Sequence, residues 1–171
     1  MRIGLISDTH GLLRPEALDF LAGCDHIVHA GDIGHADILD RLAALAPLTA
    51  VRGNNDRGPW AEALPETAAL EVGAVRIVVI HDLARFKRPA PDAGVAVVVS
   101  GHSHVPVVLH RDGTLYVNPG SAGPRRFRLP VSIGELRVDG AAVTPRLATL
   151  EGQTIPGQAG HNTRKQPVGR S

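Results

Sequence analysis

The sequence contains a single cysteine, Cys24, so no disulfide can form within the chain. A free thiol suits a reducing cytosol, and we expect Cys24 to be buried and inert. No apolar run approaches the roughly 20 residues of a membrane-spanning helix. The segment Met1–Asp8 is too short, and becomes polar too soon, for a signal peptide. These absences predict a cytoplasmic protein that makes no membrane contact.

An excess of charge of either sign is also absent. The chain has 18 Lys and Arg against 17 Asp and Glu, a formal net charge of +1, and only 3% aromatic residues. Proteins that bind nucleic acid use basic surfaces and aromatic side chains that stack on bases. Besides Tyr116, the large aromatic residues are Trp60, Phe20, Phe86 and Phe127. A nuclease, or any other protein that binds nucleic acid, is therefore the least favoured class.

The remaining composition is that of a folded globular domain. Apolar residues make up 43% and charged residues 20%. A chain of 171 residues fits one domain with a substantial core. Beyond residue 150 the apolar periodicity is lost, and Gly, Pro, Gln and Arg appear without an apolar face. We predict one domain over residues 1–150 and a flexible tail over residues 151–171.

The first part of the chain alternates short strands with amphipathic helices. Strands are expected over residues 2–7 and 25–30. A helix is expected from Pro15 to Gly23. A second helix is expected over residues 36–46, before Pro47, with an apolar face of Ile38, Leu39, Leu42 and Leu45. This order predicts a right-handed parallel βαβ layer.

From residue 66 the pattern changes to hairpins. Turns are expected at Gly73, at Asp112-Gly113 and at Asp139-Gly140, each between alternating apolar runs. The whole chain then has about ten strands with two or three helices, too many strands for one open sheet. Two sheets packed face to face are predicted.

Five apolar runs end in polar residues of the metal-ligand type. The polar blocks are Asp8-Thr9-His10, Gly31-Asp32, Gly53-Asn54-Asn55-Asp56, His81-Asp82 and Gly101-His102-Ser103-His104. Each run has the length and composition of a buried strand. Because residues past the carboxyl ends of strands line the ligand crevice of an open α/β sheet, these side chains should share one rim. Together they offer enough oxygen and imidazole nitrogen for two divalent cations.

The order of the blocks resembles that of the calcineurin-like metallophosphoesterase superfamily, namely D-x-H, G-D, G-N-x-D, H and G-H-x-H. With Asn118-Pro119-Gly120-Ser121 after them, the chain resembles the compact prokaryotic phosphodiesterases over residues 1–150. The resemblance implies an α/β fold, an α-β-β-α sandwich of two mixed sheets with the metal site at the carboxyl ends of the strands. The same fold occurs in a retromer subunit that serves as a protein scaffold.

By this resemblance, seven side chains hold two divalent ions. Asp32 bridges the two ions, and the first is also held by Asp8, His10 and His104, the second by Asn54, His81 and His102. Carboxylate, imidazole and amide ligands without thiolate suit Mn, Fe, Co, Ni or Zn, of which we favour Mn. Two such ions, about 3.5–4 Å apart, can lower the pKa of a bridging water and clamp a phosphoryl group for in-line attack by the hydroxide.

Single residues of this set also have structural explanations. Asp8 and Asp32 follow strands and would be suitable helix N-caps. His102 and His104 would suit a turn beside Gly101. On an extended segment, residues two apart such as Asp8 and His10 point to the same face. We expect none of the other histidines to be ligands, namely His26, His29, His35, His110 and His161.

Asn55 departs from the family pattern. Many members have a His there that protonates the leaving group, whereas an amide can donate a hydrogen bond but cannot deliver a proton at neutral pH. Asp56, the usual partner of that His, would instead hold Asn55 or Arg57. We predict Asn55 and Asp56 as catalytic residues and Asn54 and Asn55 as phosphate contacts.

Asp82 is a second departure, because Gly commonly follows the His of this block. Asp82 either tolerates unusual backbone angles or accepts a hydrogen bond from a ligand imidazole. Cationic candidates for the substrate phosphate are Arg57, Arg85, Lys87, Arg88, Arg125 and Arg126. Of these we favour Arg125 and Arg126, because that loop lies near the site in relatives; the alternative for all six is a solvated loop charge.

The leading interpretation is a metal-dependent phosphodiesterase acting on a small phosphorylated substrate, with nucleotides among the candidates. The alternative is a non-catalytic metal-binding scaffold on the same fold. Seven filled ligand positions favour hydrolysis, whereas the missing His is shared with the scaffold relative. A homo-oligomer is compatible with either interpretation.

Overall fold

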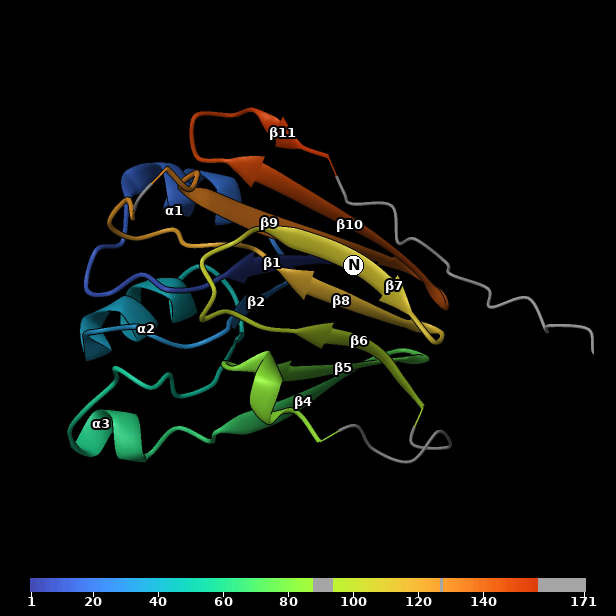
Figure 1. Cartoon of the computed structure of the whole chain (residues 1–171), viewed down its shortest axis with the longest axis horizontal. Helices are drawn as coiled ribbons and strands as arrows, with labels where there is room; N and C mark the ends of the chain where they lie inside the picture. The colour runs from blue at the N-terminus through green and yellow to red at the C-terminus, as the bar shows by residue number, and fades with distance from the viewer. Residues whose placement is uncertain (88–93, 127, 157–171) are drawn as a thin grey trace, which may run out of the picture.

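The computed structural model describes residues 1–87, 94–126 and 128–156, and its strands form two sheets (Figure 1). The strands of the first sheet are β1 (Arg2–Ile6), β2 (His26–His29), β3 (Leu48–Ala50), β9 (Ser132–Asp139), β10 (Ala142–Thr149) and β11 (Thr154–Ile155), in the order β11-β10-β9-β1-β2-β3. Those of the second are β4 (Thr67–Val72), β5 (Val75–Ile80), β6 (Val95–Val99), β7 (Val107–Arg111) and β8 (Thr114–Asn118), in the order β4-β5-β6-β8-β7.

Both sheets are mixed. In the first sheet β1, β2 and β3 run parallel, and β9 joins β1 in antiparallel pairing. In the second, β5, β6 and β8 run parallel, and the hairpin partners β4 and β7 are antiparallel to their neighbours. The predicted α/β fold with two packed mixed sheets is confirmed. Of these six parallel strands, five are followed by the polar blocks at the same rim, namely β1, β2, β3, β5 and β6.

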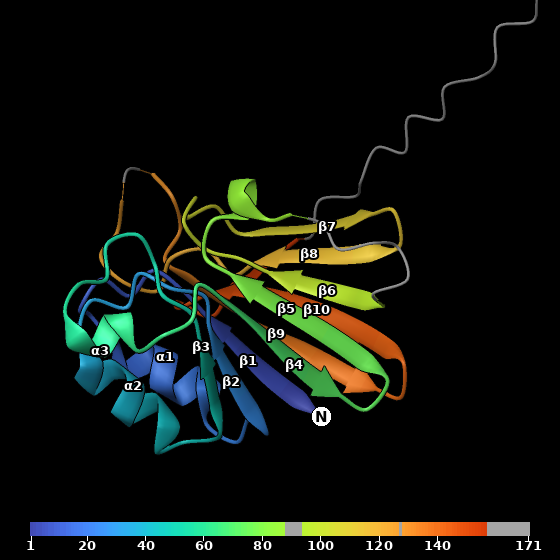
Figure 2. The ribbon, with the colours of Figure 1, turned by 90° about the horizontal axis from the view of Figure 1, so that it is seen from below.

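The helices lie on one side of the sandwich. α1 (Pro15–Leu21), α2 (Ala36–Ala43) and α3 (Pro59–Glu62) lie beside the β1-β2-β3 part of the first sheet, as Figure 2 shows. On the outer side of the second sheet, the described residues contribute the 3-10 turn η1 (Leu83–Arg85) and no α-helix. The fourth layer of the predicted α-β-β-α sandwich is thus reduced to this turn within the described ranges.

Two apolar clusters hold the layers together. One lies between the sheets and contains Ile3, Leu5, Val79 and Val97, all fully buried. The other packs the helices on the first sheet and includes Ile6, Ile27, Leu21, Leu42 and the buried thiol of Cys24. Alternate residues of β1 face the two clusters, as expected of a strand covered on both faces. The predicted burial of Cys24 is confirmed.

Elements differ from the sequence prediction in two places. α2 stops at Ala43 rather than near residue 46, so Leu45 lies outside the helix and is 39% exposed instead of lying on its apolar face. Beyond residue 150, β11 pairs with β10 through Leu147 and Ile155, so the sheet continues into the segment predicted as a tail. Residues 157–171 lie outside the described residues.

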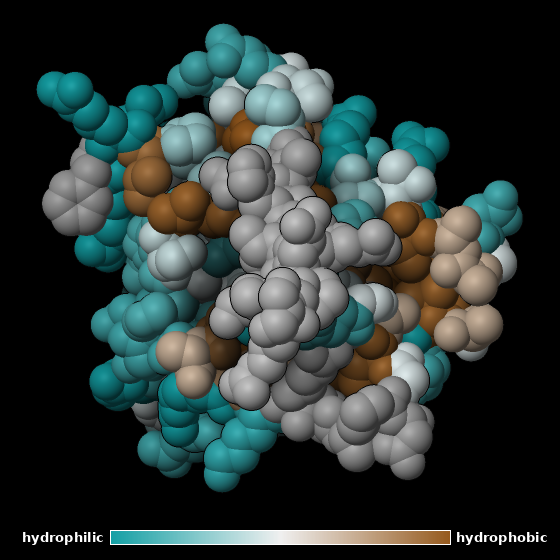
Figure 3. Space-filling view, turned by 45° about the vertical axis from the view of Figure 1, so that its right-hand side comes forward, coloured by the Kyte–Doolittle hydropathy of each residue, from teal (hydrophilic) through white to brown (hydrophobic). Residues whose placement is uncertain are grey.

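The turns at Gly73 and Asp112-Gly113 agree with prediction, whereas the turn after β9 begins one residue later than predicted, at Gly140, because Asp139 still pairs with Ala142. Asp112 and Gly113 both have positive φ, 49° and 78°, as the two central residues of a type I′ turn require. On the face seen in Figure 3, apolar residues form separate patches between polar ones. Among the helices of the described residues, none is long and apolar enough to cross a membrane.

Candidate metal centre

The five polar blocks meet at the carboxyl ends of the parallel strands, and backbone hydrogen bonds join one block to the next. The amide of Asp8 donates to the carbonyl of Gly31 (3.0 Å), and that of His10 donates to Asp32 (2.9 Å). In the second sheet the amide of Gly101 donates to the carbonyl of His81 (3.0 Å). Backbone hydrogen bonds alone therefore hold these loops together, without any contribution from side chains.

Left-handed backbone conformation marks five of the seven predicted ligands. Their φ angles are 54° for Asp8, 46° for His10, 54° for Asp32, 66° for His102 and 58° for His104. Within the described ranges, the one other non-glycine residue with positive φ is in the β7–β8 turn. Each such residue costs about 1–3 kcal/mol, and such strain is typical of functional sites.

These angles correct two expectations from the sequence. Asp8 and Asp32 are not helix N-caps, because β1 and β2 are followed by irregular segments before α1 and α2 begin. Asp8 and His10 do not lie on an extended segment either. Their side chains still converge, but they are oriented by left-handed backbone turns and not by the alternation of an extended strand.

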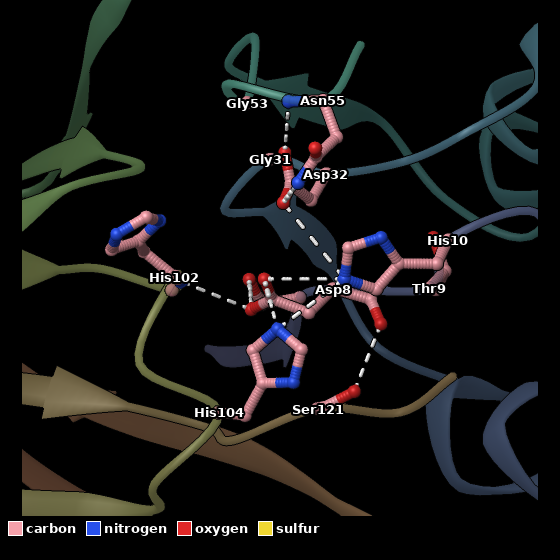
Figure 4. A network of polar contacts seen from close by, with 12 residues as sticks. Asp8, Thr9, His10, Gly31, Asp32, Gly53, Asn55, His102, His104 and Ser121 are labelled. Atoms are coloured by element: carbon pink, nitrogen blue, oxygen red, sulfur yellow. Dashed lines mark hydrogen bonds and ion pairs between the residues drawn. The ribbon is translucent and has the colours of Figure 1, made fainter. Parts of the chain in front are cut away.

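A first group consists of Asp8, His10 and His104 (Figure 4). Oδ1 of Asp8 lies 3.2 Å from Nε2 of His104 and 3.9 Å from Nε2 of His10. The two imidazole nitrogens are 3.3 Å apart. All three side chains point their ligand atoms at the same small volume.

The two oxygens of Asp8 have different surroundings. Oδ2 accepts hydrogen bonds from the hydroxyl of Ser7 (2.6 Å) and the amide of His102 (3.1 Å). Oδ1 is buried and has no hydrogen-bond partner in the described structure. A buried, unpaired carboxylate oxygen is costly unless a cation compensates it. The group therefore fits a metal ion at Oδ1.

A second group consists of Asp8, Asp32 and His81, with Asn54 and His102 beside it. Oδ1 of Asp32 is 3.4 Å from Nε2 of His81. Oδ1 of Asn54 lies 3.0 Å from that same Nε2 and 2.9 Å from Nδ1 of His102. All seven predicted ligands are thus brought together, in two adjoining groups.

Two carboxylates, rather than one, lie between the groups. Asp32 has Oδ2 at 3.8 Å from His10 and Oδ1 toward His81, which is the placement expected of a bridging ligand. Asp8 also belongs to both groups. The donor set contains no thiolate, so it suits divalent ions that accept oxygen and imidazole ligands.

In the metal-free protein, electrostatics favour the ligand forms of Asp32 and His10 but the protonated form of His81. Burial raises the pKa of Asp32, but hydrogen bonds from His81 and Asn55 outweigh it and hold this pKa well below its ordinary value. Burial lowers the pKa of His10 despite the opposing charges of Asp32 and Asp8, which keeps its ring neutral. Burial also acts to lower the pKa of His81, but its contact with Asp32 and its hydrogen bond to the Ala30 carbonyl raise it.

Asn55 and Asp56 hold the site together in ways the sequence did not indicate. The side chain of Asn55 donates to Oδ2 of Asp32 (2.6 Å), and its amide donates to Oδ1 (2.8 Å). The carboxylate of Asp56 accepts from the amides of Gly34 (2.9 Å) and Gly53 (2.8 Å), instead of holding the side chain of Asn55 or Arg57. Asp56 therefore fixes the β3 loop against the β2 loop.

Asp82 follows neither reading of the sequence. Its φ is −101°, so it needs no unusual backbone angle, and its carboxylate accepts from the amide of Ala84 at the start of η1. A short polar side chain that caps the turn accounts for the residue.

The predicted phosphate-binding cations are separated by the structure. Arg125 forms an ion pair with Glu151 (3.2 Å). Arg126 lies close enough to His10 for its positive charge to lower the pKa of the His10 ring, in addition to the larger effect of burial. Arg57, Arg85 and Lys87 line a cavity of about 760 Å³ that Asn54 and His81 also border. Arg88 lies outside the described residues.

Thr9 and His29 form a buried hydrogen-bond chain behind the two aspartates. The amide of Gly31 donates to Nδ1 of His29 (3.2 Å), and the hydroxyl of Thr9 donates to the carbonyl of Ile33 (2.9 Å). Because Nδ1 of His29 accepts a hydrogen bond, Nε2 must carry the ring proton. Nε2 therefore donates a hydrogen bond to Oγ1 of Thr9 (2.9 Å). The chain ties the segment after Asp8 to both sides of Asp32. In the sequence, only the position of His29 three residues before Asp32 hinted at this role.

Acid should destabilise the metal-free protein through His29. Burial lowers the pKa of its ring from 6.5 to about 4. Between these values the unfolded chain binds more protons, so the free energy of unfolding falls as the pH falls. The loss should reach about 3 kcal/mol by pH 4, at 1.36 kcal/mol per pH unit.

Urea unfolding of metal-free protein at several pH values measures this effect. His29→Gln keeps a donor for Thr9 but does not titrate, so its unfolding free energy should lack the part of the acid-dependent loss that His29 contributes. His110→Gln, at an exposed position of β7, is the control and should behave as wild type. The same pH dependence in wild type and His29→Gln would contradict the assignment.

Several known proteins are similar to this chain in sequence or in fold. The model of the calcineurin-like phosphoesterase superfamily domain matches residues 1–140. A probable metallophosphoesterase of Methanothermobacter thermautotrophicus is 36% identical over 152 residues, covering 82% of this chain and 87% of the relative. The structure of Yfce, a phosphoesterase from E. coli, has a TM-score of 0.72 at 25% identity, with 91% of this chain and 97% of that chain covered. Wild-type Vps29 of Entamoeba histolytica, solved with Zn²⁺, has the same fold, with a TM-score of 0.72 at 23% identity, covering 91% and 96% of the two chains.

Proposed function

The chain belongs to the calcineurin-like phosphoesterase superfamily, and from this premise we propose that it is a phosphodiesterase that holds two divalent ions, Mn²⁺ foremost. A metal-dependent phosphoesterase is supported by the family, by the curated relatives and by the two Asp–His groups. The observation that carries the proposal is the buried, unpartnered Oδ1 of Asp8 beside two imidazole nitrogens.

The chain's own residues bind and orient. Asp8, His10 and His104 would hold one ion, Asn54, His81 and His102 the other, and Asp32 both. When bound, such ions supply a nucleophilic water of lowered pKa and neutralise charge on the phosphoryl oxygens. Ser7 and the amide of His102 fix the carboxylate of Asp8, so that its Oδ1 is presented without reorganisation, and Asn55 fixes both oxygens of Asp32.

In hydrolysis the bond from the water oxygen to phosphorus forms while the ester P–O bond breaks. Asn55 cannot give a proton to the departing oxygen, because an amide does not titrate near neutral pH. Its amide group is engaged with Asp32 in any case. The departing oxygen then takes its proton from solvent, and esters with acidic leaving groups should be the better substrates.

Metal removal and reconstitution test the proposal. Protein stripped by a chelator should not hydrolyse bis(p-nitrophenyl) phosphate. Addition of Mn²⁺ should restore turnover, with up to two equivalents found by elemental analysis, whereas Ca²⁺ should not, because oxygen–imidazole sites prefer transition metals. Hydrolysis that survives exhaustive chelation would contradict a metal-dependent enzyme.

The substrate screen separates the remaining alternatives. Comparison with p-nitrophenyl phosphate, a monoester, tests the preference for diesters. Protein that binds its metals but turns over neither ester, with Mn, Fe, Co, Ni or Zn, would favour the non-catalytic scaffold.

A further inference from the structure

A cavity beside Asn54 and His81 adjoins the metal centre. Its volume is about 760 Å³, and its walls come from the segment after β3 and from the segment that follows β5. Small-molecule sites commonly have about 300–1,000 Å³. The space exceeds what a single phosphate at the metal centre would need, so it can receive the rest of a substrate.

Four cationic side chains line this cavity: Arg52, Arg57, Arg85 and Lys87. Glu66 lies between two of them, 2.9 Å from Arg52 and 3.5 Å from Arg85, so one carboxylate serves two guanidinium groups. Neither Arg57 nor Lys87 has a carboxylate partner among the described residues. The guanidinium of Arg57 donates to the backbone carbonyl of Asp56 (3.0 Å), which leaves its other donors available.

The acidic residues of the wall do not cancel these charges. Asp56 turns its carboxylate to the amides of Gly34 and Gly53, and Asp82 turns its carboxylate to the amide of Ala84. Glu62 and Glu66 remain as the acids that face four cations. The cavity is therefore cationic on balance, although the whole chain is nearly neutral.

The position of the cavity gives the direction in which a substrate extends. Asn54 and His81 belong both to the second metal group and to the cavity wall, so the two spaces are continuous. Arg125 is in a different depression with Arg14 and Glu151. Ile80, Ala84 and Phe86 add apolar wall to the cationic cavity, which suits the organic part of a ligand.

We propose that this cavity is a substrate subsite for a second phosphate group, bound chiefly by Arg57 and Lys87, so that the natural substrate carries at least two phosphates. One phosphate reacts at the metal centre and the other lies beyond Asn54 and His81. The inference rests on the proposed function and narrows its substrate class.

A matched pair of esters tests the subsite. Thymidine 5′-(p-nitrophenyl phosphate) and its 3′-phosphorylated form share the leaving group and differ by one phosphate. Wild-type protein with Mn²⁺ should show a KM about tenfold lower for the 3′-phosphorylated ester, the scale expected of charge-assisted hydrogen bonds, at similar kcat. In the Arg57→Gln/Lys87→Gln double variant the two KM values should become equal.

Two controls locate the effect. Arg111→Gln, on exposed β7, should retain the preference of wild type. A preference that survives in the double variant, or that is lost in Arg125→Gln instead, would overturn the assignment, and so would equal KM values in wild type.

Failure of the proposed function is distinguishable from failure of the subsite. If neither ester is hydrolysed, calorimetric titration with AMP and with adenosine 3′,5′-bisphosphate replaces the kinetic comparison. Tighter binding of the bisphosphate that depends on Arg57 and Lys87 would support the subsite without catalysis. Equal binding of the two nucleotides would overturn it.

Discussion

Replacing Asp8 by asparagine should remove the metal at the first group and lower kcat/KM by on the order of 10³-fold, because a bound ion contributes several kcal/mol to such reactions and each 1.36 kcal/mol is a factor of ten. The reason lies in the hydrogen bonds of the carboxylate. Ser7 and the amide of His102 both donate to Oδ2, so asparagine would place its oxygen there. Its NH₂ group would then occupy the position of Oδ1, pointing donors at the metal and toward His104.

Elemental analysis and steady-state kinetics measure this outcome together. Unfolding of the metal-free variant adds a signature that general damage would not give. Because the substitution replaces a buried carboxylate whose Oδ1 has no hydrogen-bond partner, metal-free Asp8→Asn should be at least as stable as metal-free wild type. Asp139→Asn, at the exposed end of β9, is the control. A variant with full metal content and wild-type turnover would show that Oδ1 is not a ligand.

Gly53→Ala should damage the centre through the second aspartate. An added Cβ would fall on the backbone amide and Oδ1 of Asp32 and lie 2.7 Å from its Cα. Two of these atoms belong to the backbone, so no change of rotamer can relieve the clash. We expect the free energy of unfolding to fall by about 3 kcal/mol, at the upper end for overpacked cores. Metal affinity should fall about 10–100-fold, as for other changes that displace a ligand.

Gly140→Ala separates the two causes. Gly140 has a φ of 58° and nothing within 4 Å of an added Cβ, so alanine there meets only the cost of left-handed backbone, about 1–2 kcal/mol. Its metal binding should equal that of wild type. Thermal unfolding and metal titration of both variants test the comparison, and wild-type metal affinity in Gly53→Ala would refute the close approach to Asp32.

Local sequence signals were sufficient for most of the fold. The turn at Asp112-Gly113 and the helix that begins at Pro15 follow from backbone preferences that act within a few residues. β11 was missed because two residues carry no periodicity, and its pairing with β10 depends on a neighbour that only the tertiary structure provides. The end of α2 was misplaced because Ala44 and Leu45 are good helix formers that nevertheless lie beyond the last helical residue.

The candidate site shows a similar division. All seven ligand candidates meet because each follows a strand, and strand ends are readable in the sequence. The groups that hold them were not readable. Ser7 and Thr9 are ordinary residue types, and their roles depend on hydrogen bonds to residues distant in the chain, such as Thr9 to His29. Arg125 was assigned to the phosphate by analogy, but the pairing with Glu151 depends on the course of the chain after β10.

The ligand candidates are divided between two sheets that share no strand. Asp8, Asp32 and Asn54 follow strands of one sheet, whereas His81, His102 and His104 follow strands of the other. A bound metal would therefore link the two sheets at one end of the sandwich, and the relative position of the sheets would set the distances between its ligands. That relative position is fixed by close packing of residues such as Leu5, Val79 and Val97. Methyl groups that never touch an ion thus become determinants of which ion fits.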